Sequence, residues 1–134
     1  MRDANIEVRP VTPTIGAEIH GVYLGQELGN QTFQEIHDAL MEHQVLFFRD
    51  QKLDLDQHKA FGKQFGQLAI HPASPGSDGH PETVLVHADG ETNRDMGRTW
   101  QASHWHTDVS CVEEPPMGSV LHMQTVPPFG GDTL

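Results

Sequence analysis

The spacing of apolar residues in the first third of the chain changes between two periods. Apolar and polar residues alternate over residues 6–11 and 15–22, and this period of two predicts a pair of short strands. Over residues 32–43 the apolar positions recur every three or four residues, which predicts an amphipathic helix. A capping box that begins at Thr32, or a simple cap at Asn30, is expected to satisfy the first N–H groups of this helix.

The next apolar run, at residues 45–48, predicts a buried strand because it is short and holds two phenylalanines. A second helix is predicted after it, with Asp54 as the N-cap and Gly66 as the end. Phe61 and Phe65 are four residues apart on this helix, so both are predicted to face the core.

The second half of the chain holds more turn signals. Residues 72–81 contain three prolines and two glycines and are predicted to form a loop. The apolar run at residues 83–86 precedes Asp89-Gly90, a turn signal that suits a hairpin or a loop exit. Residues 117–126 predict a further strand, which the prolines and glycines of residues 127–131 end.

The composition excludes several kinds of partner. The 134 residues carry 8 Lys and Arg against 19 Asp and Glu, a formal net charge of −11, so nucleic acids and anionic membranes are not expected to bind. No stretch approaches the roughly 20 apolar residues that cross a bilayer, and the N-terminus lacks an apolar signal core. The single cysteine, Cys111, fits a reducing compartment and predicts a cytoplasmic protein. Cys111 itself is interpreted as a small packed residue.

His106 and Asp108, in the segment W-H-T-D-V, are the candidate metal ligands. In an extended strand, residues two apart point to the same face with Cα atoms roughly 6.6 Å apart, so one metal ion can bridge the pair. An imidazole and a carboxylate are two thirds of the 2-His-1-carboxylate triad that holds Fe(II). The pattern alone is weak, because His87 and Asp89 repeat it and a solvated strand end has the same residues.

His104 shares the strand face of this pair, but it is not expected to be the third ligand. Residues four apart on a strand are separated by roughly 13 Å, which is too far for one ion with bonds of about 2 Å. The third ligand is therefore expected elsewhere in the fold, beyond Leu134.

Several motifs, taken in order, resemble the taurine dioxygenase family of Fe(II)- and 2-oxoglutarate-dependent oxygenases. They are I-G-A-E-I at residues 15–19, H-Q-V-L-F-F-R-D-Q at 43–51, F-G-Q-L at 65–68 with His71-Pro72, W-H-T-D-V at 105–109, Pro115-Pro116 and G-G-D-T-L at 130–134. The resemblance covers essentially the whole chain. It implies an α+β, mainly β fold, a double-stranded β-helix (a cupin-like jelly roll) with flanking helices, of which residues 1–134 are the N-terminal part of a single, truncated domain.

The same resemblance implies roles for four residues. His106 and Asp108 match the two early iron ligands, Thr133 matches a hydroxyl that helps to hold 2-oxoglutarate, and His71 matches a contact to the substrate sulfonate. Two positions differ from the taurine enzyme. Ser74 stands where that enzyme has a Tyr, and Ala102 or a neighbouring residue stands where it has an Asn shortly before the iron motif. The resemblance implies taurine or a related sulfonate or carboxylate as the substrate, and these two differences count against taurine itself.

The family's distal His and its Arg for 2-oxoglutarate are expected in a C-terminal half that this sequence does not contain. All 8 Lys and Arg lie at or before Arg98, so the segment after it has no guanidinium to bind a dicarboxylate.

The implied activity is hydroxylation of a small anionic substrate, a sulfonate or carboxylate, with O2 and 2-oxoglutarate consumed and succinate and CO2 formed. Family members commonly associate into homo-oligomers. Two alternatives remain open: a noncatalytic or Zn-binding jelly roll, because His and Asp also bind Zn, and an inactive fragment of the dioxygenase.

Overall fold

The computed structural model describes residues 6–72, 76–86 and 105–129. The chain forms two compact units, one of residues 1–65 together with 120–134 and one of residues 66–119.

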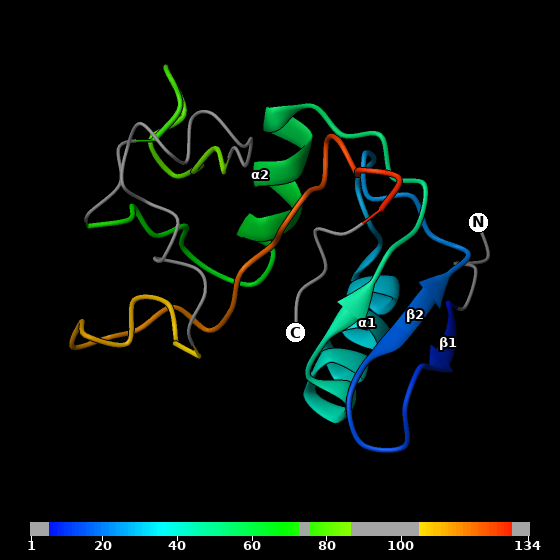
Figure 1. The fold of residues 1–134 in the computed structure, drawn as a ribbon. Helices are drawn as coiled ribbons and strands as arrows, with labels where there is room; N and C mark the ends of the chain where they lie inside the picture. The colour runs from blue at the N-terminus through cyan, green and yellow to red at the C-terminus, as the bar shows by residue number, and fades with distance from the viewer. Residues whose placement is uncertain (1–5, 73–75, 87–104, 130–134) are drawn as a thin grey trace. The chain divides into compact units, whose positions relative to one another are not determined.

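The first unit holds all the helices and strands of the described residues (Figure 1). In chain order these are β1 (Glu7–Pro10), β2 (Ala17–His20), α1 (Asn30–His43), β3 (Leu46–Phe47) and α2 (Leu55–Lys63). The sheet has the order β1-β2-β3, with β1 antiparallel and β3 parallel to β2. This arrangement agrees with the α+β class that the resemblance implies.

The turn between β1 and β2 is stabilised by local hydrogen bonds. The Thr12 hydroxyl donates to the carbonyl of Ile15 at 2.6 Å, and Val11 N–H donates to the carbonyl of Gly16 at 2.8 Å. Gly16 has a φ of 89°, a value that favours glycine. The turn aligns the strands so that Val8 lies opposite Ile19, and the two strands predicted at residues 6–11 and 15–22 are confirmed.

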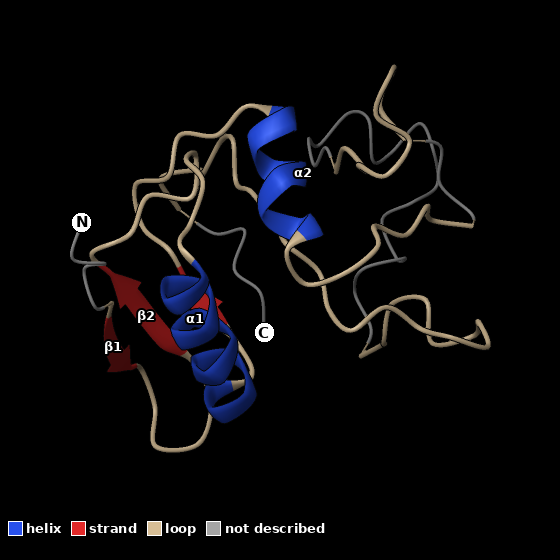
Figure 2. Ribbon diagram, turned by 180° about the vertical axis from the view of Figure 1, so that it is seen from behind, coloured by secondary structure: helices blue, strands red, loops and turns tan. Residues whose placement is uncertain are grey.

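Helix α1 lies across one face of this sheet, and Figure 2 shows it in front of the strands. The buried residues on either side are Ala17 and Ile19 from β2 and Ile36 and Ala39 from α1. The helix predicted at residues 32–43 is therefore confirmed, and the apolar side of this helix is the side that is buried.

The predicted cap of α1 is wrong. Gly29 is the N-cap residue and no side chain caps it, whereas Asn30 and Thr32 lie inside the first turn. The Glu35 carboxylate that the capping box needs is engaged elsewhere, since it accepts from Ile6 N–H and from the Gln31 side-chain amide, each at 3.1 Å. A long-range contact to the residue before β1 therefore replaces the local one.

The cap of α2 is confirmed. The Asp54 carboxylate accepts from Gln57 N–H at 2.8 Å, and the Gln57 amide oxygen accepts from Asp54 N–H at 3.0 Å, which makes a complete capping box. The helix ends at Lys63, before Gly66, whose φ is 147°.

The core of the first unit forms where α1, α2 and the segment after β2 meet. Leu24, Ile36 and Phe61 are buried there. Phe48 and Phe65 contact the Phe61 ring edge-on at centroid distances of 5.8 and 5.4 Å, an arrangement that aromatic pairs prefer. The inward orientation predicted for Phe61 and Phe65 is confirmed.

The strand predicted at residues 45–48 is confirmed in type but not in burial. Leu46 and Phe48 pack against the core, whereas Val45 and Phe47 remain 40% and 41% exposed. The reason is that successive side chains point to opposite faces of the strand, and only the face of Leu46 and Phe48 packs against the core.

The described residues of the second unit contain no helix or strand, only a β-bridge between Ser77 and His80. Ser77 N–H donates to the carbonyl of Thr83 at 3.0 Å, and His80 N–H donates to the carbonyl of Ser77 at 2.8 Å. The loop predicted at residues 72–81 is confirmed where it is described. Residues 83–86 form no strand, and the turn signal Asp89-Gly90 lies outside the described residues.

The strand predicted at residues 117–126 is wrong within the described part of the chain. Leu121 and Val126 are 73% and 69% exposed, and no strand forms. A strand requires a partner for its backbone groups. Here the carbonyl of Val120 instead accepts a hydrogen bond from the His58 ring, at 2.9 Å.

Candidate metal centre

His106 and Asp108 lie side by side, but not on a strand. The distance from His106 Nε2 to Asp108 Oδ1 is 3.4 Å, with the side chains 52% and 72% exposed. The backbone bends at Asp108 and Val109, and Val109 has a φ of 55°. The juxtaposition that the sequence predicts is present, whereas the predicted mechanism, a shared strand face, is wrong. A bend brings the two side chains together.

The residues around this pair are open to solvent. Trp105 is 91% exposed and Cys111 is exposed. The interpretation of Cys111 as a packed residue is wrong, because Cys111 is exposed.

The pair fits one divalent metal ion. Two ligands at right angles, each with a bond of about 2.1 Å, are separated by roughly 3 Å, close to the 3.4 Å between His106 Nε2 and Asp108 Oδ1. A nitrogen and an oxygen donor together suit iron, manganese or zinc. Two ligands do not complete a site, and no group of three His, Cys, Asp or Glu side chains able to hold a metal occurs among the described residues.

Of the other two predicted site residues, the structure describes His71 but not Thr133. His71 is half-buried in the second unit, and it does not join His106 and Asp108 in a three-residue group that could hold a metal. Thr133 lies outside the described residues, as do His87, Asp89 and His104. The roles predicted for His71 and Thr133 therefore stay predictions.

Two hydroxyl residues of the same turn were not predicted. Thr107 Oγ1 and Ser110 Oγ form a hydrogen bond of 2.6 Å across Asp108 and Val109. The sequence does offer a signal for this bond. Thr107 and Ser110 are three residues apart, with Asp108 between them, and hydroxyl side chains at such a spacing often form local hydrogen bonds.

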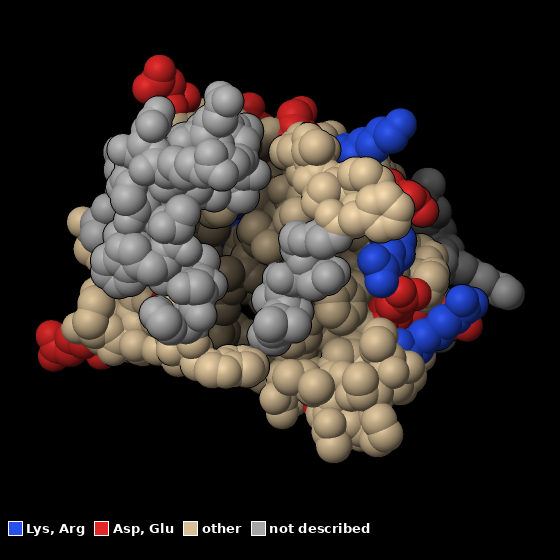
Figure 3. Space-filling view, in the orientation of Figure 1, with Lys and Arg blue, Asp and Glu red and all other residues tan. Residues whose placement is uncertain are grey.

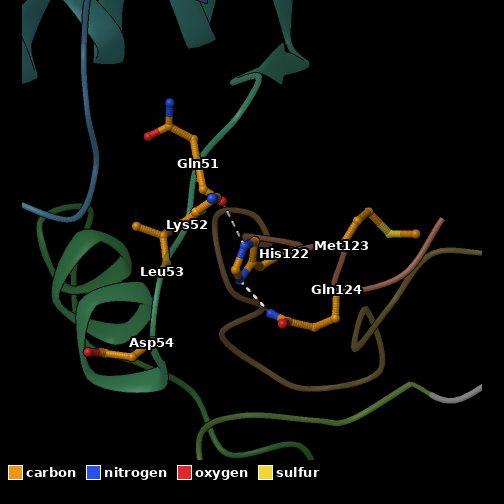
Figure 4. A pocket seen from close by; sticks show the side chains of 7 residues that line it. All are labelled: Gln51, Lys52, Leu53, Asp54, His122, Met123 and Gln124. Carbon is orange, nitrogen blue, oxygen red and sulfur yellow. Dashed lines mark hydrogen bonds between the residues drawn. The ribbon is translucent and has the colours of Figure 1, made fainter.

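The first unit contains a shallow cavity of about 390 Å³, shown in Figure 4. Its lining is Gln51, Lys52, Leu53, Asp54, His122, Met123 and Gln124. His122 Nε2 contacts the carbonyl of Gln51 at 3.1 Å, and the Gln124 amide donates to His122 Nδ1 at 2.8 Å. Both ring nitrogens of His122 are thus engaged in hydrogen bonds to residues that line the same cavity.

The outer face of the sheet carries paired charges. Arg49 donates to Glu18 at 2.8 and 2.9 Å, and Arg9 donates to Glu7 at 2.8 Å. The hydrogen bond from Arg49 holds the pKa of Glu18 below its ordinary value of 4.5, and the hydrogen bond from Arg9 does the same for Glu7. On the face drawn in Figure 3, Lys and Arg side chains lie beside Asp and Glu side chains. The described residues on the face drawn in Figure 3 therefore form no continuous basic patch to which an anionic polymer could bind.

No helix in residues 6–72, 76–86 and 105–129 has the length and apolar character that crossing a bilayer demands.

Comparison with known proteins gives a consistent result. The chain is 42% identical over 130 residues to an alkylsulfatase of Acinetobacter baylyi and 39% identical over 130 residues to an alpha-ketoglutarate-dependent sulfate ester dioxygenase of Pseudomonas putida. Each match covers 96% of this chain but only 38% and 40% of the relative. The chain therefore spans about two fifths of the length of these curated relatives.

A crystal structure of a taurine dioxygenase from Burkholderia xenovorans is similar in fold, with a TM-score of 0.55 and 39% identity, over 62% of this chain and 32% of that one. The sequence also matches the family described as taurine catabolism dioxygenase TauD, TfdA, over residues 7–134. That match includes both candidate ligands, and with it the predicted resemblance is confirmed: the chain belongs to the TauD/TfdA dioxygenase family.

Proposed function

We propose that this chain is part of an Fe(II)- and 2-oxoglutarate-dependent dioxygenase that oxidises a small anionic sulfur compound, a sulfate ester or a sulfonate. The observation that carries the proposal is the 3.4 Å distance between His106 Nε2 and Asp108 Oδ1, inside the region that matches the family. The names of the relatives support the substrate class, since they include a sulfate ester dioxygenase and an alkylsulfatase.

In this proposal His106 and Asp108 hold the iron ion, and Thr133 helps to hold 2-oxoglutarate. A further His that binds the iron and an Arg that binds 2-oxoglutarate are proposed to lie in the part of the enzyme that corresponds to the unmatched length of the relatives. The bound iron supplies oxidation of a substrate C–H bond by O2, coupled to conversion of 2-oxoglutarate into succinate and CO2. The chain's own residues fix the metal on one side and leave the other side open to the two co-substrates.

His71 orients the substrate in this proposal. An imidazole N–H can donate a hydrogen bond to a sulfate or sulfonate oxygen. When the hydroxylated carbon bears the sulfur-containing group, the product is expected to lose sulfate or sulfite and leave an aldehyde.

The complete fold proposed is a double-stranded β-helix with flanking helices, to which residues 1–134 contribute the N-terminal part. We further propose that the enzyme works in the cytoplasm, where its exposed Cys111 stays reduced, and that it associates into homo-oligomers.

Anaerobic titration of the whole protein with Fe(II) and then 2-oxoglutarate tests the iron site. A visible charge-transfer band is expected in the wild type and is expected to disappear in His106→Ala and Asp108→Ala. Glu113→Ala removes another exposed carboxylate from the same segment and should leave the band unchanged. A colourless protein that binds Zn(II) but gives no band would instead support the noncatalytic alternative.

Turnover tests the substrate class. Succinate formation is expected with alkyl sulfates or alkanesulfonates, and His71→Ala should raise KM for these anions without removing the charge-transfer band. Succinate formation with aryloxyalkanoates but not with sulfur anions would contradict the proposed substrate.

A further inference from the structure

The turn that carries the two candidate ligands contains an unfavourable backbone conformation. Val109, directly after Asp108, has a φ of 55°. This left-handed region is rare for any residue with a Cβ, and it is least favourable for a β-branched one. Such a conformation persists only where the surrounding structure holds it, and it is frequent at functional sites.

Two side-chain hydroxyls hold this turn. Thr107 Oγ1 and Ser110 Oγ are 2.6 Å apart, and this bond spans both Asp108 and Val109. Further along, Val112 N–H donates to the carbonyl of Val109 at 3.3 Å. The described contacts therefore close two overlapping turns, residues 107–110 and 109–112, and the first of them contains the ligand Asp108.

The ring closed by the two hydroxyls contains the entire backbone of Asp108. A bond between Thr107 and Ser110 restricts φ and ψ of every residue between them, and these angles set the direction of the Asp108 carboxylate. Because His106 directly precedes Thr107, that direction contributes to the 3.4 Å distance between His106 Nε2 and Asp108 Oδ1.

We propose that Thr107 and Ser110 are positioning residues for the metal site: their hydrogen bond holds Asp108 against His106 before the metal binds. The proposal rests on the proposed function of His106 and Asp108 as ligands. Neither hydroxyl needs to touch the metal. Their effect is to remove alternative backbone conformations that would otherwise have to be excluded at the moment of binding.

The test is an Fe(II) titration, with the metal alone and no co-substrate, in the anaerobic whole protein. Thr107→Val removes the hydroxyl but keeps the branched shape, and Ser110→Ala removes the other hydroxyl. Each is expected to weaken Fe(II) binding roughly 3- to 10-fold, the size of one net hydrogen bond. Thr107→Ser and Ser110→Thr keep the bond and should bind within about 2-fold of the wild type.

The double variant Thr107→Val/Ser110→Ala is expected to be no weaker than the weaker single variant, because both changes remove the same bond. Thr83→Val is the matched control. It removes a hydroxyl that donates to the carbonyl of His80 at 2.8 Å in the same unit, so it should lower the melting temperature and leave Fe(II) affinity unchanged.

The outcomes separate this inference from the proposed function. Wild-type protein that binds Fe(II), with Thr107→Val and Ser110→Ala binding equally well, would overturn the positioning role and leave the ligand assignment intact. Wild-type protein that does not bind Fe(II) would overturn both. Additive losses in the double variant, or failure of Thr107→Ser to restore affinity, would also contradict the inference.

Discussion

The side chain of Gln51 is hydrogen-bonded to the backbone of Leu24: Gln51 Oε1 accepts from Leu24 N–H at 2.9 Å. Gln51 Nε2 donates to the carbonyls of Arg49 and Val22, at 2.9 and 3.3 Å. One side chain thus links the segment after β2 to the segment after β3. Because Leu24 is buried in the core, its N–H group has limited access to water as a replacement partner.

Gln51→Ala is therefore expected to lower the free energy of unfolding by about 1–3 kcal/mol, the cost of leaving a buried donor unsatisfied. The measurement is denaturant unfolding of the whole protein. Gln34→Ala is the matched control, since it removes only an exposed bond to Asp38 four residues along α1 and should cost about 0.2–0.5 kcal/mol. Equal losses in the two variants would contradict the linking role.

Ile36→Ala tests the core of the first unit. Ile36 is fully buried against Leu24 and Phe61, so its truncation should leave a cavity and cost about 2–5 kcal/mol in denaturant unfolding. Met41→Ala on the same helix removes a side chain that is 54% exposed and should change stability by roughly 0.5 kcal/mol or less. A small effect at Ile36 would show that α1 is not anchored by this contact.

Asp54→Ala tests the capping box of α2. Loss of the carboxylate leaves Gln57 N–H without its acceptor at the helix start, and the expected loss of stability is about 0.5–2 kcal/mol. Asp54→Asn keeps an oxygen acceptor and should retain most of the stability. Equal unfolding midpoints for Asp54→Ala and the wild type would rule out a capping contribution.

The Glu18–Arg49 pair predicts a pH dependence. The hydrogen bond from Arg49 lowers the pKa of Glu18 from 4.5, so the folded state favours the charged carboxylate. The stabilisation is present above the ordinary pKa and is lost as the pH falls through the lower folded value. The stability difference between wild type and Glu18→Gln should therefore be present at neutral pH and shrink below about pH 4.5.

Unfolding curves between roughly pH 3 and pH 7 measure this difference, and added salt should reduce it because the pair is accessible to solvent. When Arg49→Gln is introduced into both proteins, the pH-dependent effect of the Glu18→Gln substitution should largely disappear. A difference that grows on acidification would have the wrong sign.

Much of the local structure could be predicted from the sequence. The 3.6-residue period over residues 32–43 and the Asp54–Gln57 spacing specify α1 and the start of α2, since these interactions join residues only three or four apart. The W-H-T-D-V segment likewise identified the two candidate ligands, and its position among the other motifs identified the family.

The cap of α1, the exposed side of β3 and the bend at Asp108 could not be predicted in this way. Glu35 leaves its expected capping position because Ile6, 29 residues earlier, offers it a backbone N–H. The sequence predicts the pairing of His106 with Asp108 from a strand that does not form. The pair lies instead at a turn that the Thr107–Ser110 hydrogen bond closes.

The sequence by itself determined which segments form helices, where α2 begins and which residue types are offered to a metal. Only the tertiary structure decided which faces are buried and how the two candidate ligands meet. The physical reason is range: periodicity and capping depend on neighbours along the chain, whereas burial and strand pairing depend on partners that folding brings from distant positions.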